Sequence, residues 1–451
     1  MASLIGQIFC FVSRLFQIPY CLVLLSLMPL MLTAQTNGMT LAEVRTKVLL
    51  GNPSVDEQLR RIVAAEAVLK QARSAYFPTV TLKGNYGLID VSLHPEVNPD
   101  LRFSDSYRQA STGLQTSWLI FDGFVRQAHV LAAKHTLNQQ RDIADETRRL
   151  LLLSTTLAFR EAQLANETIR IAQQNYTFNR ELEHDAHKRF EAGILPESDV
   201  HNFSIRALLA EAVRLEAELN LSTACTVLAE LMALAEAHLP QAMHPVAIDF
   251  RELDPIPSFN EELQYAFINR PDYKALKSGQ QALEQKVRAA KGELLPKLSF
   301  VGQVNYSDQD GYATSSRHGN YDSFVGVAAT WDLFTGGRKI STVEEAEAEL
   351  AALQKQEECL KLSIRSTLRQ RIDEAQTVQA VLERRKKIEA LSASVRDSVT
   401  KSYQAGMVSI TRLNEAQTDL VSACGNYATA YISYLLVLNR LDVETGRVLE
   451  N

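Results

Sequence analysis

A short run of imidazole and carboxylate side chains near position 185 has the clearest capacity for chemistry. His184, Asp185 and His187 lie in a stretch with helical periodicity. The two histidines are three positions apart and would share a helix face, from which they could bind a metal ion. No further ligand stands nearby in the sequence, so a solvated, charged helix face is the simpler interpretation. We expect no metal site here.

Motifs that identify enzymes by their spacing do not occur in the chain. The sequence holds no GxSxG, no phosphate loop, no HExxH and no GxGxxG. A net charge of -6 also argues against a nucleic-acid-binding protein, which usually has a basic face. Five cysteines in 451 residues exclude a disulfide scaffold. We expect neither a catalytic site nor a cofactor.

The first 34 residues form a segment of their own. They carry one charge, Arg14, followed by an apolar run from Leu15 to Leu32. The run approaches the ~20 residues that a membrane-spanning helix needs. Because the small residue Ala34 follows this run, where a signal peptidase would cut, a secretory signal peptide over residues 1–34 is the better interpretation. Beyond it no apolar run reaches 18 residues, so the exported chain is either soluble or crosses a membrane as strands.

Self-comparison shows that one sequence unit occurs twice. Five short markers recur in the same order, the first three 218 positions apart and the last two 213 apart. One five-residue difference in length between the third and fourth markers reconciles the two offsets. The chain is therefore a tandem duplication. The markers are Thr40–Glu43 with Ser258–Glu261 (two predicted capping boxes), Pro53 with Pro271, Pro78 with Pro296, Trp118–Gly123 with Trp331–Gly336, and Phe190–Gly193 with Tyr403–Gly406.

Both copies contain the same elements in the same order. Each starts with a short helix and a helix of about 24 residues, continues with two strands around a polar loop, and ends with two long helices joined at a glycine turn. The segment 237–257 holds four prolines, which exclude a regular helix, and links the repeats. The first repeat is 35–236, with strands at about 79–89 and 111–121, a long helix at about 126–191 and a tip at about 192–199. The second is 258–451, with strands at about 297–307 and 323–333, a long helix at about 338–404 and a tip at about 405–412.

Helix lengths indicate how these elements pack. A helix over 126–191 would extend ~100 Å at ~1.5 Å per residue. The shorter helices before and after it sum to nearly the same length, so stacked end to end they would lie along it. In 338–404 apolar residues recur in steps of three and four, which is typical of a coiled-coil seam. We expect a mainly α chain with a small β part, built from two antiparallel rods.

The four predicted strands alternate between apolar and polar side chains. Alternation over ten or eleven residues is typical of outer-membrane barrel strands, but a half-buried sheet of a soluble protein has the same pattern. The signal peptide favours the membrane interpretation. The apolar face carries Val80, Leu82, Tyr86 and Leu88 in the first strand, Leu114, Trp118 and Ile120 in the second, Leu298, Phe300, Val304 and Tyr306 in the third, and Val325, Val327, Ala329 and Trp331 in the fourth.

Four strands cannot close a barrel, and open strand edges are not tolerated in lipid. The chain must therefore oligomerise. A dimer would give eight strands and an interior filled by side chains, whereas a trimer would give twelve strands and room for a lumen. The polar loops at 90–110 and 308–322 would face outside, and both rods would hang from the periplasmic mouth.

In order and spacing, these features resemble the TolC-like outer-membrane efflux protein family, also called outer membrane factors. The resemblance covers essentially the whole exported chain and rests on the helix-opening Pro271, the helix-to-strand Pro78 and Pro296, the strand-to-helix Phe-x-Gly steps and both glycine tip turns. It implies a homotrimer with a 12-stranded β-barrel in the outer membrane of a Gram-negative bacterium and a long α-barrel in the periplasm. The segment 237–257 would belong to an equatorial belt around the rods.

The resemblance also implies a function and partners. Proteins of this kind are not enzymes; they passively conduct substrates to the exterior in a tripartite efflux or type I secretion system. Their partners are an inner-membrane pump of the RND or ABC type and a periplasmic adaptor (membrane fusion) protein. A different class stays open on the residues alone, namely a soluble periplasmic coiled-coil scaffold whose strand hairpins pair with a partner.

The family's tip turns close the periplasmic entrance through polar bonds between helices and a ring of acidic residues. Here the turns contain Gly193 and Gly406. Ser198, Asp199 and Tyr403 match gate positions of the family. The resemblance therefore assigns these residues to a periplasmic gate.

The second tip departs from the family pattern, which puts the acidic ring in doubt. Val408 stands in place of a bonding arginine and Arg412 in place of the first ring acid, while Glu415 keeps the second. Asp199 and Arg412 are 213 positions apart, so they would alternate around the tip. Opposite charges within ~4–6 Å could hold the entrance shut. Two solvated charges worth ~0–1 kcal/mol are the equally open alternative.

The chain has two tryptophans, Trp118 and Trp331, at equivalent positions of the two repeats. Both are expected on the outward strand face, just before the bend from strand to helix. Tryptophan is enriched at membrane–water interfaces. We therefore predict that these two residues mark the periplasmic boundary of the membrane.

Overall fold

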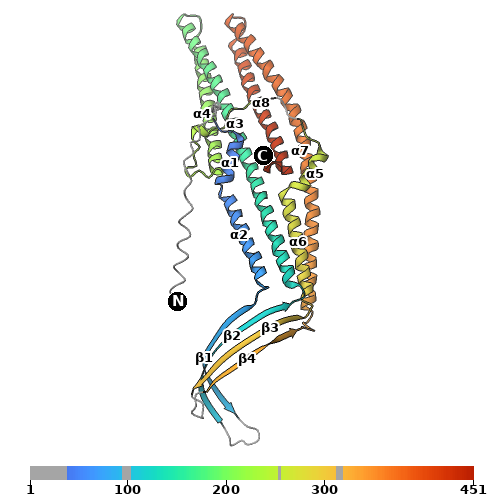
Figure 1. Cartoon of the computed structure of the whole chain (residues 1–451). Helices are drawn as coiled ribbons and strands as arrows, with labels where there is room; N and C mark the ends of the chain where they lie inside the picture. The colour runs from blue at the N-terminus through green and yellow to red at the C-terminus, as the bar shows by residue number, and fades with distance from the viewer. Residues whose placement is uncertain (1–37, 94–102, 252–254, 311–317, 451) are drawn as a thin grey trace, which may run out of the picture. The chain divides into compact units, whose positions relative to one another are not determined.

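The computed structural model describes residues 38–93, 103–251, 255–310 and 318–450, all of them in the unit Gly38–Asn451. The predicted signal peptide at 1–34 lies outside the described residues, as do parts of the two polar loops between strands. The described chain is mainly helical and carries four strands (Figure 1). The predicted fold class, mainly α with a small β part, is confirmed.

Each repeat contributes four helices and two strands. The first repeat contains α1 (Leu41–Gly51), α2 (Pro53–Ser74), β1 (Thr79–Leu93), β2 (Phe103–Phe121), α3 (Val125–Glu191) and α4 (Glu197–Leu231). The second contains α5 (Phe259–Asn269), α6 (Pro271–Gly292), β3 (Lys297–Asp310), β4 (His318–Thr330), α7 (Arg338–Gln404) and α8 (Ile410–Thr445). Two single 3-10 turns, Gln241–Met243 and Arg447–Leu449, follow α4 and α8.

The helix boundaries follow from local chemistry. Thr40 and Glu43 form the predicted capping box at α1, and prolines open α2 and α6, where the missing N–H costs nothing. Ser258 precedes α5 as predicted, but its side chain accepts no capping bond, so the second capping box is wrong. α4 ends at Leu231, two residues before Ala233, which has a left-handed φ of 54°.

The shorter helices stack end to end along the long ones, as their lengths predicted. The Asn52 side chain, at the start of α2, donates to the Leu231 carbonyl at the end of α4, over 2.9 Å. In the second repeat the equivalent Arg270 donates to the Glu444 carbonyl over 3.0 Å. These two bonds occupy equivalent positions, so the duplication extends to individual contacts.

Two hydrophobic clusters lie beside these joins. In the first repeat Phe159 of α3 packs with Val48 of α1 and Leu228 of α4, all at most 1% exposed. In the second, Leu368 of α7 packs with Leu441 of α8. The best-buried core therefore sits where three helices meet, and it holds each long helix to its two shorter partners.

The four long helices lie in the order α4–α3–α8–α7. This order follows from the contacts of α3 with α4, of α3 with α8 and of α7 with α8 (Figure 1). Farther along, α3 also packs against α2 and α6. The two repeats therefore meet along α3, while α4 and α7 are the outermost helices of the set.

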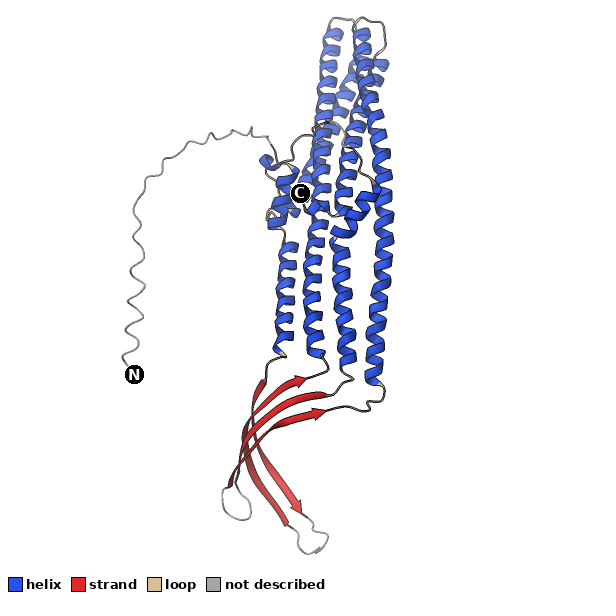
Figure 2. Cartoon of the chain, turned by 45° about the vertical axis from the view of Figure 1, so that its right-hand side comes forward, coloured by secondary structure: helices blue, strands red, loops and turns tan. Residues whose placement is uncertain are grey.

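The strands form one antiparallel sheet in the order β1-β2-β3-β4. They join the helices at the ends of α2, α3, α6 and α7 (Figure 2). β1, β2 and β3 run farther than the apolar alternation predicted; β1, for example, continues to Leu93 rather than 89. Backbone pairing does not need an apolar side-chain pattern, which explains the longer strands. β4 also starts earlier than predicted, at His318 rather than 323, but it ends at Thr330, so Trp331 lies just beyond it.

One described helix, α8, contains a window long and apolar enough to cross a membrane by length and composition. A third of that window is buried within the chain. Because α8 packs along both α3 and α7, its apolar residues serve the helix bundle.

Candidate functional site

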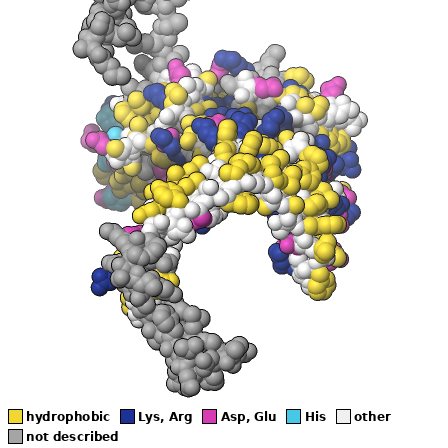
Figure 3. Space-filling model, turned by 60° about the horizontal axis from the view of Figure 1, so that its bottom comes forward, with side chains coloured by type: hydrophobic (Ala, Val, Ile, Leu, Met, Phe, Trp, Pro, Cys, Tyr) yellow, Lys and Arg dark blue, Asp and Glu magenta, His cyan; other side chains and the backbone are white. Residues whose placement is uncertain are grey.

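The sheet carries a continuous apolar face. Strand pairing aligns Leu82 with Leu114, and Leu114 in turn with Val304, so the predicted outward residues share one surface. These side chains are strongly exposed in the single chain; Leu82 is 72% exposed and Val325 71%. Figure 3, seen from the end at which the strands lie, shows a broad band of hydrophobic side chains. Such a face needs an apolar environment.

The opposite face of the sheet is mostly polar. It presents Lys83, Gln115 and Asn305, and the Asn305 amide donates to Asp322 over 3.1 Å. Within the described residues β1 pairs only with β2 and β4 only with β3. Both outer strands therefore keep a row of unpaired backbone groups, and a polar face with two open edges suits the inside of a larger barrel.

Both tryptophans tie the strand ends to the helices. The Trp118 indole N–H donates to the Tyr76 carbonyl over 2.9 Å, and that of Trp331 donates to the Leu294 carbonyl over 3.0 Å. Each carbonyl follows the last turn of a helix, where backbone acceptors lack helical partners. As whole residues, Trp118 and Trp331 stay 45% and 59% exposed. The sequence located both residues, but it did not reveal this second role.

Arg126 forms a buried junction between sheet and helices that sequence reasoning missed. Its guanidinium donates to the carbonyls of Leu119 over 2.6 Å and Ile120 over 3.0 Å. It pairs with Asp122 at 3.0 Å and lies over the Tyr76 ring. The Asp122 carboxylate also accepts the Arg126 backbone N–H over 2.9 Å. The equivalent residue of the second repeat, Lys339, keeps the positive charge and donates to the Glu293 carbonyl over 2.7 Å.

Both tip turns have the same geometry. Gly193 has φ +73° and Gly406 φ +72°, a conformation that disfavours side chains. In the first turn the Gly193 N–H donates to the Phe190 carbonyl and the Ile194 N–H to the Arg189 carbonyl, each over 2.8 Å. The second turn repeats both bonds at equivalent residues. This pair of bonds is the Schellman arrangement, which ends a helix sharply.

The tips of the two repeats meet at Tyr403, in the last turn of α7. The Arg189 guanidinium of α3 lies 5.7 Å from the centre of the Tyr403 ring and pairs with Asp185 at 2.8 Å. Burial raises the pKa of the Tyr403 hydroxyl, and the charges of Asp185 and Asp199 act in the same direction while Arg189 opposes them. The sequence assigned Tyr403 to the gate but gave no indication of Arg189.

The other predicted gate residues lie near the starts of α4 and α8, with Glu415 in the second turn of α8. Ser198 is exposed and Asp199 half-buried. Arg412 pairs with Glu415 on its own helix at 3.2 Å, with both side chains more than half exposed. Among the described residues no ion pair joins Asp199 to Arg412 within one chain. Any attraction between those two would have to act between copies.

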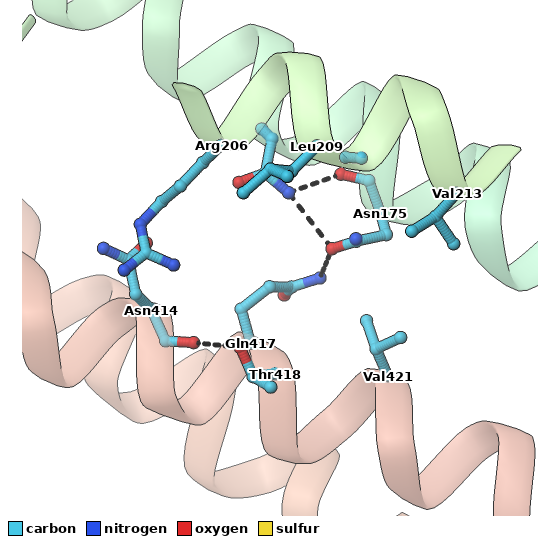
Figure 4. A pocket seen from close by; sticks show the side chains of 10 residues that line it. Asn175, Arg206, Leu209, Val213, Asn414, Gln417, Thr418 and Val421 are labelled. Carbon is cyan, nitrogen blue, oxygen red and sulfur yellow. Dashed lines mark hydrogen bonds between the residues drawn. The ribbon is translucent and has the colours of Figure 1, made fainter. Parts of the chain in front are cut away.

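A cavity between the repeats lies farther along the helices from the tips (Figure 4). It measures about 310 Å³, and its walls come from α3, α4 and α8. The Gln417 amide donates to Asn175 Oδ1 over 3.0 Å, and the Asn179 amide donates to the same oxygen over 3.1 Å. Gln417 Oε1 is buried and has no hydrogen-bond partner among the described groups. Sequence reasoning missed this cluster, because carboxamides on a long helix usually face solvent.

In the described part of the chain, no three His, Cys, Asp or Glu side chains are grouped so as to hold a metal ion. His184 and His187, which opened that possibility, are both exposed on α3.

The chain matches the family model described as outer membrane efflux protein over residues 44–234 and 263–447. The two matched segments correspond to the two repeats. TolC of Escherichia coli is 23% identical over 426 residues, covering 90% of this chain and 81% of that protein. The outer membrane efflux protein BepC of Brucella suis is 22% identical over 352 residues, covering 78% of this chain and 73% of that one.

Solved structures show the same fold. The outer-membrane channel OprN superimposes with a TM-score of 0.75 at 19% identity, covering 91% of both chains. The CmeC outer membrane channel of Campylobacter jejuni also gives 0.75, at 17% identity, covering 90% of this chain and 85% of that one.

Proposed function

Because the chain belongs to the outer membrane efflux protein family, we propose that three copies form a passive channel of a tripartite efflux or type I secretion system. Members of this family are outer-membrane channels and not enzymes, so this chain is an outer-membrane protein with a large periplasmic portion. The observation that carries the proposal is a sheet that is apolar on one face, polar on the other and open at both edges.

The open edges support assembly. In lipid every backbone N–H and C=O needs a partner inside the protein, since an unpaired group costs several kcal/mol. Pairing β4 of one copy with β1 of the next satisfies both edges. Two copies would close eight strands around an interior filled by side chains, whereas three close twelve around a lumen. The trimer therefore suits a channel.

The height of the apolar face supports a membrane location. On β2 the outward face runs from Trp118 to the first charge, Arg108, which is ten residues away. Ten steps of ~3.3 Å at a tilt of ~40° span about 25 Å, the height of the apolar band of outer-membrane barrels. Tyr86, Tyr306 and Tyr321 lie near the far end, with the last two rings 5.1 Å apart. Tryptophans at one boundary and tyrosines at the other would form the two aromatic girdles.

The helices supply the periplasmic part. α3 and α7 each have 67 residues, which corresponds to ~100 Å at ~1.5 Å per residue. Twelve such columns from three chains would form a tube that reaches from the barrel toward the inner membrane. A periplasmic adaptor and an RND or ABC pump are the partners that such a duct requires.

The tips are the proposed gate of this tube. We assign Ser198, Asp199, Tyr403, Arg412 and Glu415 to it, with Asp199 of one copy attracting Arg412 of the next. In a single chain Arg412 has Glu415 as its partner, so a closed ring would require Arg412 to share its charge between two carboxylates. Single-channel conductance of Asp199→Ala and Arg412→Ala tests the assignment. Both variants should open more often, and unchanged conductance would leave them as solvated tip charges.

The alternative is a soluble periplasmic scaffold, and membrane fractionation distinguishes it from a channel. The proposed channel stays with the outer membrane after a high-salt wash, because its apolar face is in lipid. The purified protein should also give single-channel currents in planar bilayers. Release by salt, or bilayers that stay silent, would contradict the channel.

A further inference from the structure

A cavity of about 400 Å³ lies where the two repeats meet, between α3 and α8. Its walls come from Arg160 of α3, from Pro255 and Pro257 of the linker, from Glu262 of α5 and from the C-terminal part of α8. This volume falls in the range of small-molecule sites, ~300–1,000 Å³. Since α3 and α8 are the inner two of the four long helices, the cavity belongs to a single chain.

Two opposite charges line this cavity without forming an ion pair. In the described part of the chain, neither Arg160 nor Asp442 of α8 has an ion-pair partner within 4.0 Å. A second pair on the wall, Arg447 with Glu262 at 2.9 Å, is already satisfied. Among the charged groups that the structure describes there, the cavity therefore keeps one unpaired cation and one unpaired carboxylate.

Hydrogen bonding at the cavity is also incomplete. The Arg160 guanidinium donates to Gln163 Oε1 over 2.7 Å, but its Nε is buried and has no acceptor among the described groups. Asn439 lies one helical turn before Asp442, on the same face of α8, and its buried Oδ1 has no described donor. A buried polar atom left without a partner destabilises the protein. A ligand with an acceptor at one end and a donor at the other would satisfy both atoms.

Burial makes both unpaired charges unfavourable. It lowers the pKa of Arg160 and raises the pKa of the Asp442 carboxyl. Arg45 of α1 adds a second positive charge, which lowers the pKa of both groups. Its guanidinium donates to Thr156 over 3.1 Å and forms no ion pair with any residue that the structure describes. An anion beside Arg160 would therefore stabilise two cations that otherwise repel each other.

We propose that this cavity is a binding site for a free α-amino acid with an apolar side chain. The carboxylate of the ligand accepts hydrogen bonds from Arg160, and its ammonium group donates to Asp442 and Asn439. The side chain of the ligand lies against Leu435 and Leu438, which also line the cavity. An α-amino acid fits because one carbon carries both charged groups, so the ligand bridges an arginine and an aspartate that do not pair directly.

The site is expected once per chain, although the chain is a duplication. A shift of 213 positions relates Arg160 to Asp373 and Asp442 to Ala229. The equivalent place therefore has a carboxylate where the cavity has its cation, and an alanine where the cavity has its carboxylate. Because the cavity lies within one chain, amino-acid binding does not depend on the proposed channel. A protein that binds the ligand but gives no currents would refute the channel alone.

Calorimetric titration of the full-length protein in detergent with three probes tests the site. At pH 7 leucine carries a carboxylate, an ammonium group and a branched side chain. Isocaproate lacks only the ammonium group, and isoamylamine lacks only the carboxylate. Leucine should bind saturably, with one molecule per chain. It should bind about tenfold more tightly than either analogue, because each analogue leaves a charged hydrogen bond unmade.

Two substitutions separate the two ends of the ligand. Asp442→Asn should weaken leucine binding about tenfold and leave isocaproate binding unchanged, because only leucine has an ammonium group. Arg160→Gln should weaken the binding of both carboxylates and leave that of isoamylamine unchanged. The matched controls are Asp419→Asn, at an exposed position of α8, and Arg206→Gln, at a partly exposed position of α4. Both controls lie outside the cavity and should leave all three affinities unchanged.

Other results would overturn the site. Absence of saturable leucine binding would mean that the cavity holds only water. Equal binding of the three probes would mean that it takes any apolar molecule. If Asp442→Asn weakened isocaproate as much as leucine, its effect would be structural and the ammonium contact would be wrong. If Arg160→Gln failed to fold, the three probes on the unsubstituted protein would still distinguish an amino-acid site from an unselective cavity.

Discussion

Arg126 offers the sharpest test of how the sheet is attached to the helices. Its side chain is 11% exposed and that of Asp122 is 7% exposed, so the pair is largely out of water. The guanidinium joins three segments, since it donates to Leu119 and Ile120 at the end of β2 and covers Tyr76 after α2. Arg126→Ala removes all of these contacts and leaves the Asp122 carboxylate buried without its counter-charge.

The size of the effect follows from that geometry. Removing one partner of a buried ion pair costs about 3–5 kcal/mol, because the remaining charge is left uncompensated. Arg126→Lys keeps the charge but loses the fork that reaches two carbonyls, so we expect a loss of about 1–2 kcal/mol. Lys339 occupies the equivalent position in the second repeat and serves as a natural precedent. Asp122→Ala/Arg126→Ala should be less destabilised than Arg126→Ala alone, since no unpaired charge remains.

Tryptophan fluorescence during urea unfolding in detergent is a suitable assay. Trp118 donates to the Tyr76 carbonyl, beside the ring that Arg126 covers, so its emission reports on this junction. The reasoning would be refuted if Arg126→Ala cost less than about 1 kcal/mol, or if lysine were as damaging as alanine. If the double variant were less stable than Arg126→Ala, Asp122 would stabilise the junction independently of the ion pair.

Three further outcomes are expected. The fluorescence of Trp118 and Trp331 should be quenched more strongly by lipids brominated near the headgroup than by lipids brominated near the end of the acyl chain. Stronger quenching by the second kind of lipid would contradict their place at the membrane interface. Gly193→Ala and Gly406→Ala should each destabilise a tip by about 1 kcal/mol, because alanine disfavours a φ near +72°. The effect should appear as roughly fivefold faster amide hydrogen exchange at that tip. An unchanged exchange rate would mean that the turns tolerate a side chain. Hydrogen bonds from Lys361, Gln280 and Tyr273 lower the pKa of Glu357 to about 2. Its carboxylate therefore stabilises the fold above pH ~4.5, and this contribution is lost as the pH falls toward about 2. Glu357→Gln should lower the free energy of unfolding by about 1–2 kcal/mol at pH 7, and the melting temperature of the variant should fall less steeply than that of the wild type as the pH drops below ~4.5. If both proteins lose stability equally over this range, other groups cause the pH dependence.

The repeats and long helices could be predicted because their signals are periodic and occur twice. The predicted long helices at 126–191 and 338–404 agree within a residue with α3 and α7. The apolar face of the sheet was also predictable, since strand alternation assigns each side chain to one face. The end of β1 at Leu93 was not predicted, because after Leu88 the apolar residues Ile89, Val91 and Leu93 alternate out of phase with the residues before them.

Contacts between segments that are far apart in the chain could not be predicted from the sequence. Nothing local distinguishes Arg126 from the solvated arginines elsewhere on α3, because its partners depend on where β2 ends. Gln417 looked like an ordinary polar residue of an amphipathic helix until α3 and α8 were seen to pack together. The duplication nevertheless helps to identify such contacts, since a bond found in one repeat predicts a contact between the equivalent residues of the other.

The central claim is that one chain supplies a third of a closed barrel. Electron cryomicroscopy of the full-length protein in lipid nanodiscs tests it most directly. The account predicts a threefold ring of twelve strands, with β4 of each copy paired to β1 of the next and Trp118 and Trp331 at one lipid boundary. A closed eight-stranded dimer, or a four-stranded sheet with its edges covered by other segments of the same chain, would contradict it.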